Sequence, residues 1–220
     1  MKNRLLIGTI SLVLLAAALS RAGVDPSSAY TLSGPYVVRN LQVFLVHGPD
    51  RVPGQRYLTL GEAMETGKVV VHETGNVQQL RIENHAGLPV FIQSGDIVKG
   101  GRQDRVISLD LIIPPGKGGI PLDAFCVESG RWAKRGDEQA SRFASNAYML
   151  SSRDLRLAAK QTRRQGEVWA NVASQQARLN ENVRKLSGKA GVDVRANASA
   201  SSLQLSMEND DLQELVRTYT

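Results

Sequence analysis

Two short stretches of this chain bring arginines and carboxylates close together. Residues 100–105 read GGRQDR, and residues 128–132 read ESGRW. Arginines bind phosphate and carboxylate groups through paired N–H donors, and a neighbouring carboxylate can act as a general base. The pattern therefore predicts either an anion site that uses Asp104 or Glu128, or a structural cluster of ion pairs. The candidate ligand-binding residues are Gly100, Gly101, Arg102, Gln103, Arg105, Arg131 and Trp132.

Two strand-like runs must position these charges. Apolar residues alternate along residues 105–113 and again along residues 120–128, so each run presents one apolar face. The loop between the runs reads PPGKGG, which is typical of a turn. If the runs pair around this loop, Arg105 lies opposite Glu128, and we expect these side chains to form an ion pair. A pocket that also held Asp104 would require a bulge, because Asp104 faces the other side of a regular strand.

The amino terminus has the pattern of a secretory signal peptide. A basic start at residues 1–4 precedes an apolar run at residues 5–19, and Ser20 or Ala22 supplies a small residue before a cleavage point. The run is short for a membrane span, which takes roughly 20 apolar residues. We expect residues 1–22 to be removed and the protein to be periplasmic or secreted from a bacterium. No cysteine follows the run to carry a lipid, and the alternative is an uncleaved membrane anchor.

The formal net charge of +6 is concentrated in one part of the chain. Residues 131–164 contain nine basic and three acidic residues. One positive stripe at helical spacing is formed by Arg153, Arg156, Lys160 and Arg163. The stripe predicts either a solvated helix face or a surface that docks an acidic protein partner. We expect no nucleic acid partner, because aromatic residues that could stack on bases are missing between the basic ones.

Other chemistries find no support in the sequence. The three histidines are far apart, and Cys126 is the single cysteine, so neither metal-site spacing nor an intramolecular disulfide is present. Cys126 lies in an apolar run, which favours a small buried side chain over a nucleophile. The GKGG sequence at residues 116–119 lacks the spacing of a phosphate-binding loop. We therefore expect no cofactor and no metal site.

The order of the elements predicts an α+β fold. Short strands and turns before Trp132 favour a β sandwich or small barrel, and helical patterns follow it. A helix at about residues 167–186 carries an apolar face that we expect to pack on the sheet. The predicted organisation is one domain over residues 37–186 and a loop-rich tail over residues 187–220 that ends in a last helix.

Several local signals are more specific. Residues 37–46 are strand-like and follow a loose lead-in at residues 23–36. Thr59 and Glu62 have the spacing of a capping box and predict the start of a short helix. The serine pair at residues 151–152 predicts the start of a second helix, which ends near residue 165.

Three segments in order resemble one known family. They are IENHAGLPVFIQSGDIVKGGRQDRV at residues 82–106, IIPPGKGGIPLDAFCVESGRW at residues 112–132 and QGEVWANV at residues 165–172. From about residue 37 onward, the chain is similar to the ARG-and-rhodanese-phosphatase-superfamily-associated protein domain. The family's motif positions fall on Gly100, Gly101, Gln103, Asp104, Arg105, Cys126, Glu128, Gly130, Arg131, Trp132, Gln165, Val168 and Trp169.

The resemblance implies a link to ADP-ribose or nucleotide chemistry, because the family name records an association with ADP-ribosylglycohydrolases. It carries over no catalytic residue, and it implies that the tail is truncated, since family members continue further. We expect an exported binding or interaction module whose arginine and carboxylate cluster seats a phosphate-like or nucleotide-like anion. The alternative is a hydrolase or transferase that acts on ADP-ribose-like or phosphorylated substrates through Asp104 or Glu128. Whether the protein is an enzyme stays open.

Overall fold

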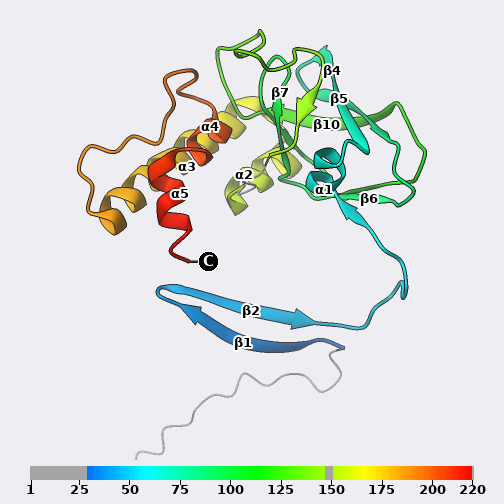
Figure 1. Ribbon diagram of the computed structural model, residues 1–220, viewed down its shortest axis with the longest axis horizontal. Coiled ribbons are helices and arrows are strands. Elements are labelled where there is room, and N and C mark those ends of the chain that lie inside the picture. Colours follow the sequence, from blue (N-terminus) through cyan, green and yellow to red (C-terminus); the bar gives the residue numbers. More distant parts are fainter. Residues whose placement is uncertain (1–28, 147–150, 220) are drawn as a thin grey trace, which may run out of the picture. The chain divides into compact units, whose positions relative to one another are not determined.

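The computed structural model describes residues 29–146 and 151–219 (Figure 1). The chain divides into two compact units, Met1–Arg51 and Val52–Thr220. The expected signal peptide at residues 1–22 lies outside the described residues. Within the described part of the chain, none of the helices combines the length and the apolar character that crossing a membrane demands.

The first unit contains a β-hairpin. Strands β1 (Thr31–Val38) and β2 (Leu41–His47) pair in antiparallel fashion around a two-residue turn. Arg39 in this turn has a φ of 54°. The expected single strand over residues 37–46 is therefore wrong, and the stretch expected to be a loose lead-in at residues 23–36 contains most of β1. The turn was missed because an Arg-Asn pair interrupts an otherwise continuous apolar run without the glycine that usually marks such hairpins.

The main sheet of the second unit is nearly closed into a barrel. Its strands, in spatial order, are β11 (Phe143–Ala144), β7 (Ile97–Gly100), β8 (Arg105–Ile107), β10 (Ile120–Cys126), β5 (Gln79–Asn84) and β4 (Val69–Asn76). The two edge strands meet where His72 pairs with Arg142, and the Glu73 N–H donates to the Ser141 carbonyl at 3.0 Å. The expected β-rich sandwich or small barrel is thus confirmed in its barrel-like form.

A smaller sheet and a short helix lie beside the barrel (Figure 1). The sheet joins β3 (Leu58–Thr59), β6 (Val90–Ile92) and β9 (Leu111–Ile113). Helix α1 (Leu60–Glu65) starts at the predicted capping box: Thr59 Oγ1 accepts from the Glu62 N–H, and the Glu62 carboxylate accepts from the Thr59 N–H at 2.9 Å. This reciprocal pair satisfies two backbone donors that the first helical turn leaves open.

The carboxyl-terminal half is helical, as expected. Its elements are α2 (Arg153–Leu157), a π-helical turn η1 (Ala158–Thr162), α3 (Gln165–Ser187), α4 (Leu203–Met207) and α5 (Asp210–Val216). Ser152 caps α2 as predicted. Helix α4 falls in the tail that was expected to be rich in loops, and α5 lies where a last helix was expected. Figure 1 shows α4 and α5 lying alongside α3.

The hydrophobic core has two main parts. The barrel interior is filled by alternating strand residues, which include Val71, Leu80, Ile82, Ile107, Leu122 and Ala124. On the other side of the sheet, Phe125 and Val127 pack with Val168 and Val172 of α3 and with Leu203 of α4. The apolar face of α3 therefore covers the end of β10. This end is the place where the two charged stretches meet.

Candidate functional site

The register between the two strand-like runs differs from the expected one. Strand β8 pairs with β10, but Arg105 lies opposite Cys126 and two residues away from the predicted partner, Glu128. The run at residues 105–113 breaks at Ser108, and its second half becomes β9, which pairs with β6. The expected Arg105–Glu128 ion pair is therefore wrong. Arg105 instead pairs with Glu73 of β4, with 3.3 Å between Nη2 and Oε2, and both side chains are buried.

Glu128 is held by two arginines from the loop that follows it. Arg131 donates from Nε to Oε1 at 2.8 Å and from Nη2 to Oε2 at 2.7 Å. Arg135 adds a bond from Nη1 to Oε1 at 3.4 Å, and the Asp104 N–H reaches Oε2 at 3.2 Å. Glu128 is fully buried. Both carboxylate oxygens thus already accept two hydrogen bonds.

Asp104 is engaged in the same way. Arg135 forms a two-pronged ion pair with it, with both nitrogen–oxygen distances at 3.1 Å. The Gly100 N–H donates to Oδ1 at 2.9 Å, and the Ser202 hydroxyl donates to Oδ2 at 2.7 Å. Asp104 is also fully buried. We call Asp104, Glu128, Arg131 and Arg135 the clamp, because together they join the loop after β7, the loop after β10 and the segment before α4.

Sequence reasoning missed two members of this arrangement. Arg135 belongs to the basic segment and was counted there only as surface charge, although it lies four residues after Arg131. Ser202 is 98 residues from Asp104 in the sequence, and its only local signal is as the cap of α4. A cap residue that also binds a distant carboxylate leaves no pattern in the sequence.

The electrostatics of the clamp favour the ionised form of Glu128. Burial by itself raises the pKa of Glu128, but hydrogen bonds from Arg131, Ser199 and the Asp104 N–H outweigh it, and the pKa lies below its usual value. Burial likewise opposes the charge of Arg135, yet its bonds to Asp104 and Glu138 raise its pKa above the usual value. A general base must have a lone pair free for a substrate proton, and the clamp leaves neither carboxylate in that state.

The other predicted site residues surround the clamp. Gln103 donates from Nε2 to the Glu128 carbonyl at 3.1 Å, which closes the turn from inside. Arg102 is exposed, and its guanidinium lies 5.3 Å from the centre of the Trp132 ring, while that of Arg105 lies 5.6 Å from it. Of the predicted ligand-binding set, Arg102 and Trp132 are the side chains that face solvent. Gly101 is buried beside the ring of Phe143.

The third motif, at residues 165–172, binds α3 to the end of β10. Gln165 accepts from the Cys126 N–H at 2.9 Å and donates to the Cys126 carbonyl at 2.8 Å, as a neighbouring strand would. Trp169 donates from its ring N–H to the Glu128 carbonyl at 3.1 Å. Burial raises the pKa of the Cys126 thiol, and the nearby Arg105 offsets this only in part. Cys126 is therefore placed as a small core residue.

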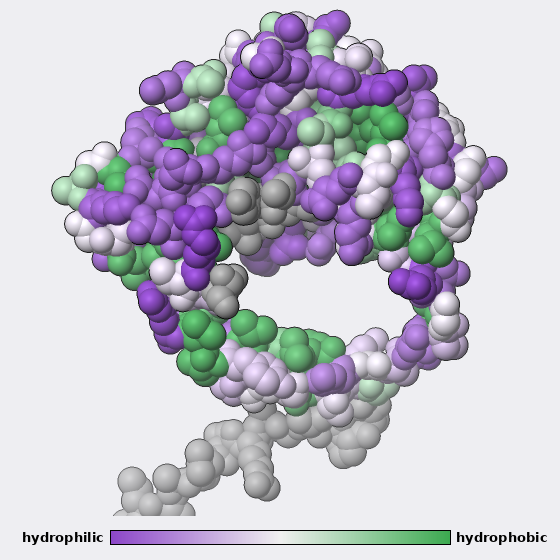
Figure 2. Space-filling model, in the orientation of Figure 1, coloured by the Kyte–Doolittle hydropathy of each residue, from purple (hydrophilic) through white to green (hydrophobic). Residues whose placement is uncertain are grey.

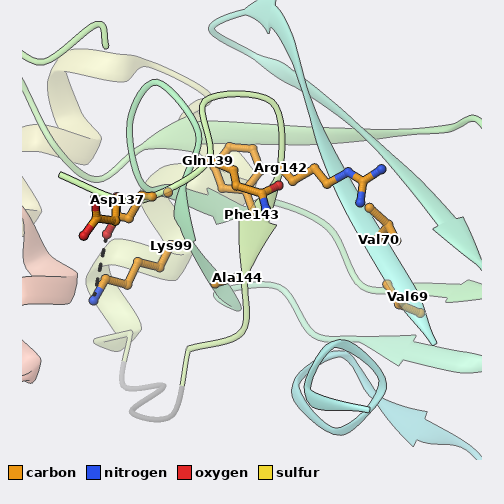
Figure 3. A pocket seen from close by; sticks show the side chains of 10 residues that line it. Val69, Val70, Lys99, Asp137, Gln139, Arg142, Phe143 and Ala144 are labelled. Carbon is orange, nitrogen blue, oxygen red and sulfur yellow. Dashed lines mark ion pairs between the residues drawn. The ribbon is translucent and has the colours of Figure 1, made fainter. Parts of the chain in front are cut away.

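One cleft of about 380 Å³ opens at the seam between the two edge strands of the barrel. Figure 3 shows Lys99 and Asp137 at one end of it, and Arg142 at the other end near Val70. Lys99 pairs with Glu208 at 2.6 Å and lies 4.0 Å from Glu138. The cleft is lined by two cations and two carboxylates, so it has no strong preference for either sign of charge.

A second cleft, of about 280 Å³, lies beside the basic stripe of α2 and η1. We call it the cationic cleft, and its lining residues are Gln93, Ser94, Asp110, Arg153, Arg156, Leu157 and Lys160. Lys160 pairs with Asp110 at 2.5 Å, and Asp110 also accepts from the Ser94 N–H at 2.8 Å. These bonds hold the pKa of Asp110 below its usual value. Within the described residues, the guanidinium of Arg156 has no hydrogen bond or ion pair.

One comparison with known proteins identifies the family of this chain. A barrel-like sheet followed by helices, with three motifs fastened around one strand end, defines the class of domain. The chain belongs to the family described as the ARG and Rhodanese-Phosphatase-superfamily-associated Protein domain, whose model matches residues 29–219. Neither the curated proteins nor the solved structures contain a match. Across the part of the chain that the structure describes, no group of three or more His, Cys, Asp or Glu residues could hold a metal ion.

Proposed function

We propose that this protein is an exported, non-catalytic binding module and that its ligand is an anion. The motif residues act as a structural clamp in this proposal, and the cationic cleft is the ligand seat. The observation that carries the proposal is the balance of charge around that cleft. Arg153, Arg156 and Lys160 line it with a single carboxylate, Asp110, which Lys160 already neutralises.

The state of the motif carboxylates supports a structural role. Asp104 and Glu128 are buried, and each of their oxygens is bound by an arginine of the loop that follows β10. A hydrolase or transferase that used either group would first have to break a buried ion pair, which costs about 3–5 kcal/mol. The enzyme alternative therefore has no specific observation in its favour.

The arrangement of Arg156 supports an anion as the ligand. Its aliphatic stem lies against Gly95, where an added Cβ atom would overlap it. Because Arg156 is partly buried and its stem is held in place in this way, its guanidinium is pre-organised for two parallel bonds to a phosphate or carboxylate. The buried Ser94 also lines the cleft. A phosphate-bearing small molecule and an acidic protein segment share this chemistry, and both remain as sources of the anion.

Export is the other part of the proposal, and it rests on the signal-peptide pattern of residues 1–22. The compartment bears on the ligand, because an exported protein meets phosphorylated small molecules and acidic surfaces more often than cytosolic nucleotides. Fusion of residues 1–28 to a reporter that is active only outside the cytoplasm tests this part. An inactive reporter would show that the fusion stays in the cytoplasm and would contradict export.

Binding is tested by calorimetric titration with pyrophosphate, ADP-ribose and polyglutamate. Arg156→Gln should weaken binding of the preferred anion about 10- to 100-fold, because a hydrogen bond to a charged group contributes about 1.5–3 kcal/mol. Arg164→Gln is the control, since it removes one charge from the same basic segment outside the cleft and its partner is Glu167. Equal weakening by both variants, or turnover of ADP-ribose that Glu128→Gln abolishes, would overturn the proposal.

A further inference from the structure

The cleft at the seam of the barrel, which we call the seam cleft, is lined by residues of the second unit alone. Its volume of about 380 Å³ lies near the lower end of the range of about 300–1,000 Å³ for small-molecule pockets. Its apolar lining residues are Val69, Val70, Phe143 and Ala144. Figure 2 shows that the visible surface of the second unit is mostly hydrophilic, with small apolar areas in between. The seam cleft therefore suits a small ligand with one apolar part.

One end of the seam cleft lacks a positively charged donor. Asp137 lies there beside Lys99 (Figure 3). The Lys99 ammonium group already donates to both oxygens of Glu208, at 2.8 and 2.6 Å, and it lies 4.0 Å from Glu138. Among the residues that the structure describes, the Asp137 carboxylate has no hydrogen bond or ion pair, and the buried Oε2 of Glu138 accepts no hydrogen bond. This end of the cleft can therefore accept hydrogen bonds from a cation.

The other end of the seam cleft carries a guanidinium without a counter-charge. Arg142 lies there, near Val70 (Figure 3). Its backbone is held by a bridge to His72 and by the pairing of the next residue, Phe143, with Gly100. Across the described part of the chain, its exposed guanidinium forms no hydrogen bond or ion pair. An arginine whose backbone is fixed and whose guanidinium is free offers two parallel N–H donors to a carboxylate.

A ligand with a single charge does not match these two ends. A simple anion would pair with Arg142 but would share the cleft with the unpaired carboxylate of Asp137. A simple cation would pair with Asp137 but would share the cleft with the unpaired guanidinium. An uncharged ligand would leave both groups without a partner. A ligand that carries a carboxylate and an ammonium group is complementary to both ends.

We propose that the seam cleft binds the zwitterion of an amino acid or short peptide with an apolar side chain. The carboxylate of the ligand accepts hydrogen bonds from Arg142, its ammonium group donates to Asp137, and its side chain lies on Val70 and Phe143. The small volume limits the ligand to about one or two residues. The seam cleft shares no lining residue with the cationic cleft. This site therefore does not depend on the anion proposed for the cationic cleft.

Calorimetric titration with leucine and with the dipeptide leucyl-leucine tests this proposal. The N-acetylated and the amidated form of each ligand serve as analogues that lack one charge. The wild type should bind the zwitterion at least about tenfold more tightly than either analogue, because each analogue loses a hydrogen bond between charged groups. The tighter of the two zwitterions shows whether one or two residues fill the cleft. Failure of both zwitterions to bind, or equal binding of a zwitterion and its analogues, would overturn the proposal.

Two variants assign each charge of the ligand to one end of the seam cleft. Asp137→Asn should weaken binding of the zwitterion about 10- to 100-fold and leave binding of the N-acetylated form unchanged, since that form has no ammonium group. Arg142→Gln should weaken binding of the zwitterion to a similar extent and leave binding of the amidated form unchanged. Arg164→Gln is the control, because Arg164 pairs with Glu167 outside the cleft. Equal weakening by Arg164→Gln and Arg142→Gln would contradict the proposed site.

Discussion

Arg135 and Asp104 form a two-pronged ion pair across 31 residues of sequence, with both nitrogen–oxygen distances at 3.1 Å. Asp104 also accepts the Ser202 hydroxyl, so one buried carboxylate joins two loops of the barrel to the carboxyl-terminal helices. The residues that look most like a catalytic site are in this way the residues that hold the domain together. In the proposed function, anion binding falls to the cations of the cationic cleft.

Asp104→Asn should strongly destabilise the protein. The change leaves Arg135 without its buried counter-charge, and breaking such a pair costs about 3–5 kcal/mol. Urea unfolding of the variant measures this loss. Asp137→Asn is the control, because Asp137 is an exposed carboxylate in the same loop as Arg135, and it should change the free energy of unfolding by less than about 0.5 kcal/mol. Similar effects of the two substitutions would contradict the clamp.

Gly101→Ala should also destabilise the protein. Gly101 has a φ of 56°, and an added Cβ atom would lie 2.4 Å from the ring of Phe143. The left-handed backbone and the overlap together should cost roughly 2–4 kcal/mol. Gly130→Ala has a similar φ of 83° but open space around the Cβ position, so it isolates the backbone part. Thermal unfolding should give Gly101→Ala a lower melting temperature than Gly130→Ala. Equal melting temperatures would contradict the packing explanation.

Asp96 makes stability depend on pH. Burial raises the pKa of Asp96 to about 6, although the Gln93 N–H opposes this. Because the folded state binds the proton more tightly than the unfolded chain does, stability falls as pH rises from about 4 to 6 and stays reduced above 6. Asp96→Asn should therefore raise the free energy of unfolding at neutral pH by up to about 3 kcal/mol.

The gain from Asp96→Asn should shrink as the pH is lowered through 6, because the wild-type carboxyl is then neutral as well. Unfolding curves of both proteins at several pH values measure this convergence. An asparagine can still accept from the Gln93 N–H, so the turn is preserved. A variant that is less stable than wild type at every pH would show that the ionised carboxylate is required.

Cys126 should be inert in the folded protein. The thiol is buried and burial raises its pKa, so little thiolate is present to react. Modification by a thiol reagent should proceed at the rate of unfolding and accelerate in urea. Leu186→Cys adds a thiol at a position that is 51 % exposed, and this thiol should react at once. Rapid modification of wild-type protein without denaturant would show that Cys126 is accessible.

The sequence predicted the parts of the fold that local patterns determine. The capping box at Thr59, the cap at Ser152 and the apolar face of α3 each depend on spacings within one or two turns. The change from strands to helices near Trp132 also follows from periodicity alone. Each of these features is specified by residues that are close together in the sequence, so it could be predicted without knowledge of the tertiary structure.

The candidate site was harder to predict because its contacts are not local. Arg105 pairs with Glu73, which lies on β4. The predicted hairpin of residues 105–113 and 120–128 does not include this strand. The chain also leaves the expected hairpin at Ser108 to join another sheet, so counting along the strands gave the wrong register. The motifs correctly identified where charges meet, but not which charges pair.

The most direct test compares the two places where an anion could bind. Pyrophosphate is titrated into wild type, Arg156→Gln and Arg102→Gln under identical conditions. Arg102 is the exposed arginine of the motif cluster, whereas Arg156 lines the cationic cleft. We expect Arg156→Gln to weaken binding at least about tenfold and Arg102→Gln to leave it unchanged. Loss of binding in Arg102→Gln, with binding by Arg156→Gln unaffected, would place the anion site at the motif cluster. It would contradict the purely structural role assigned to the motif residues.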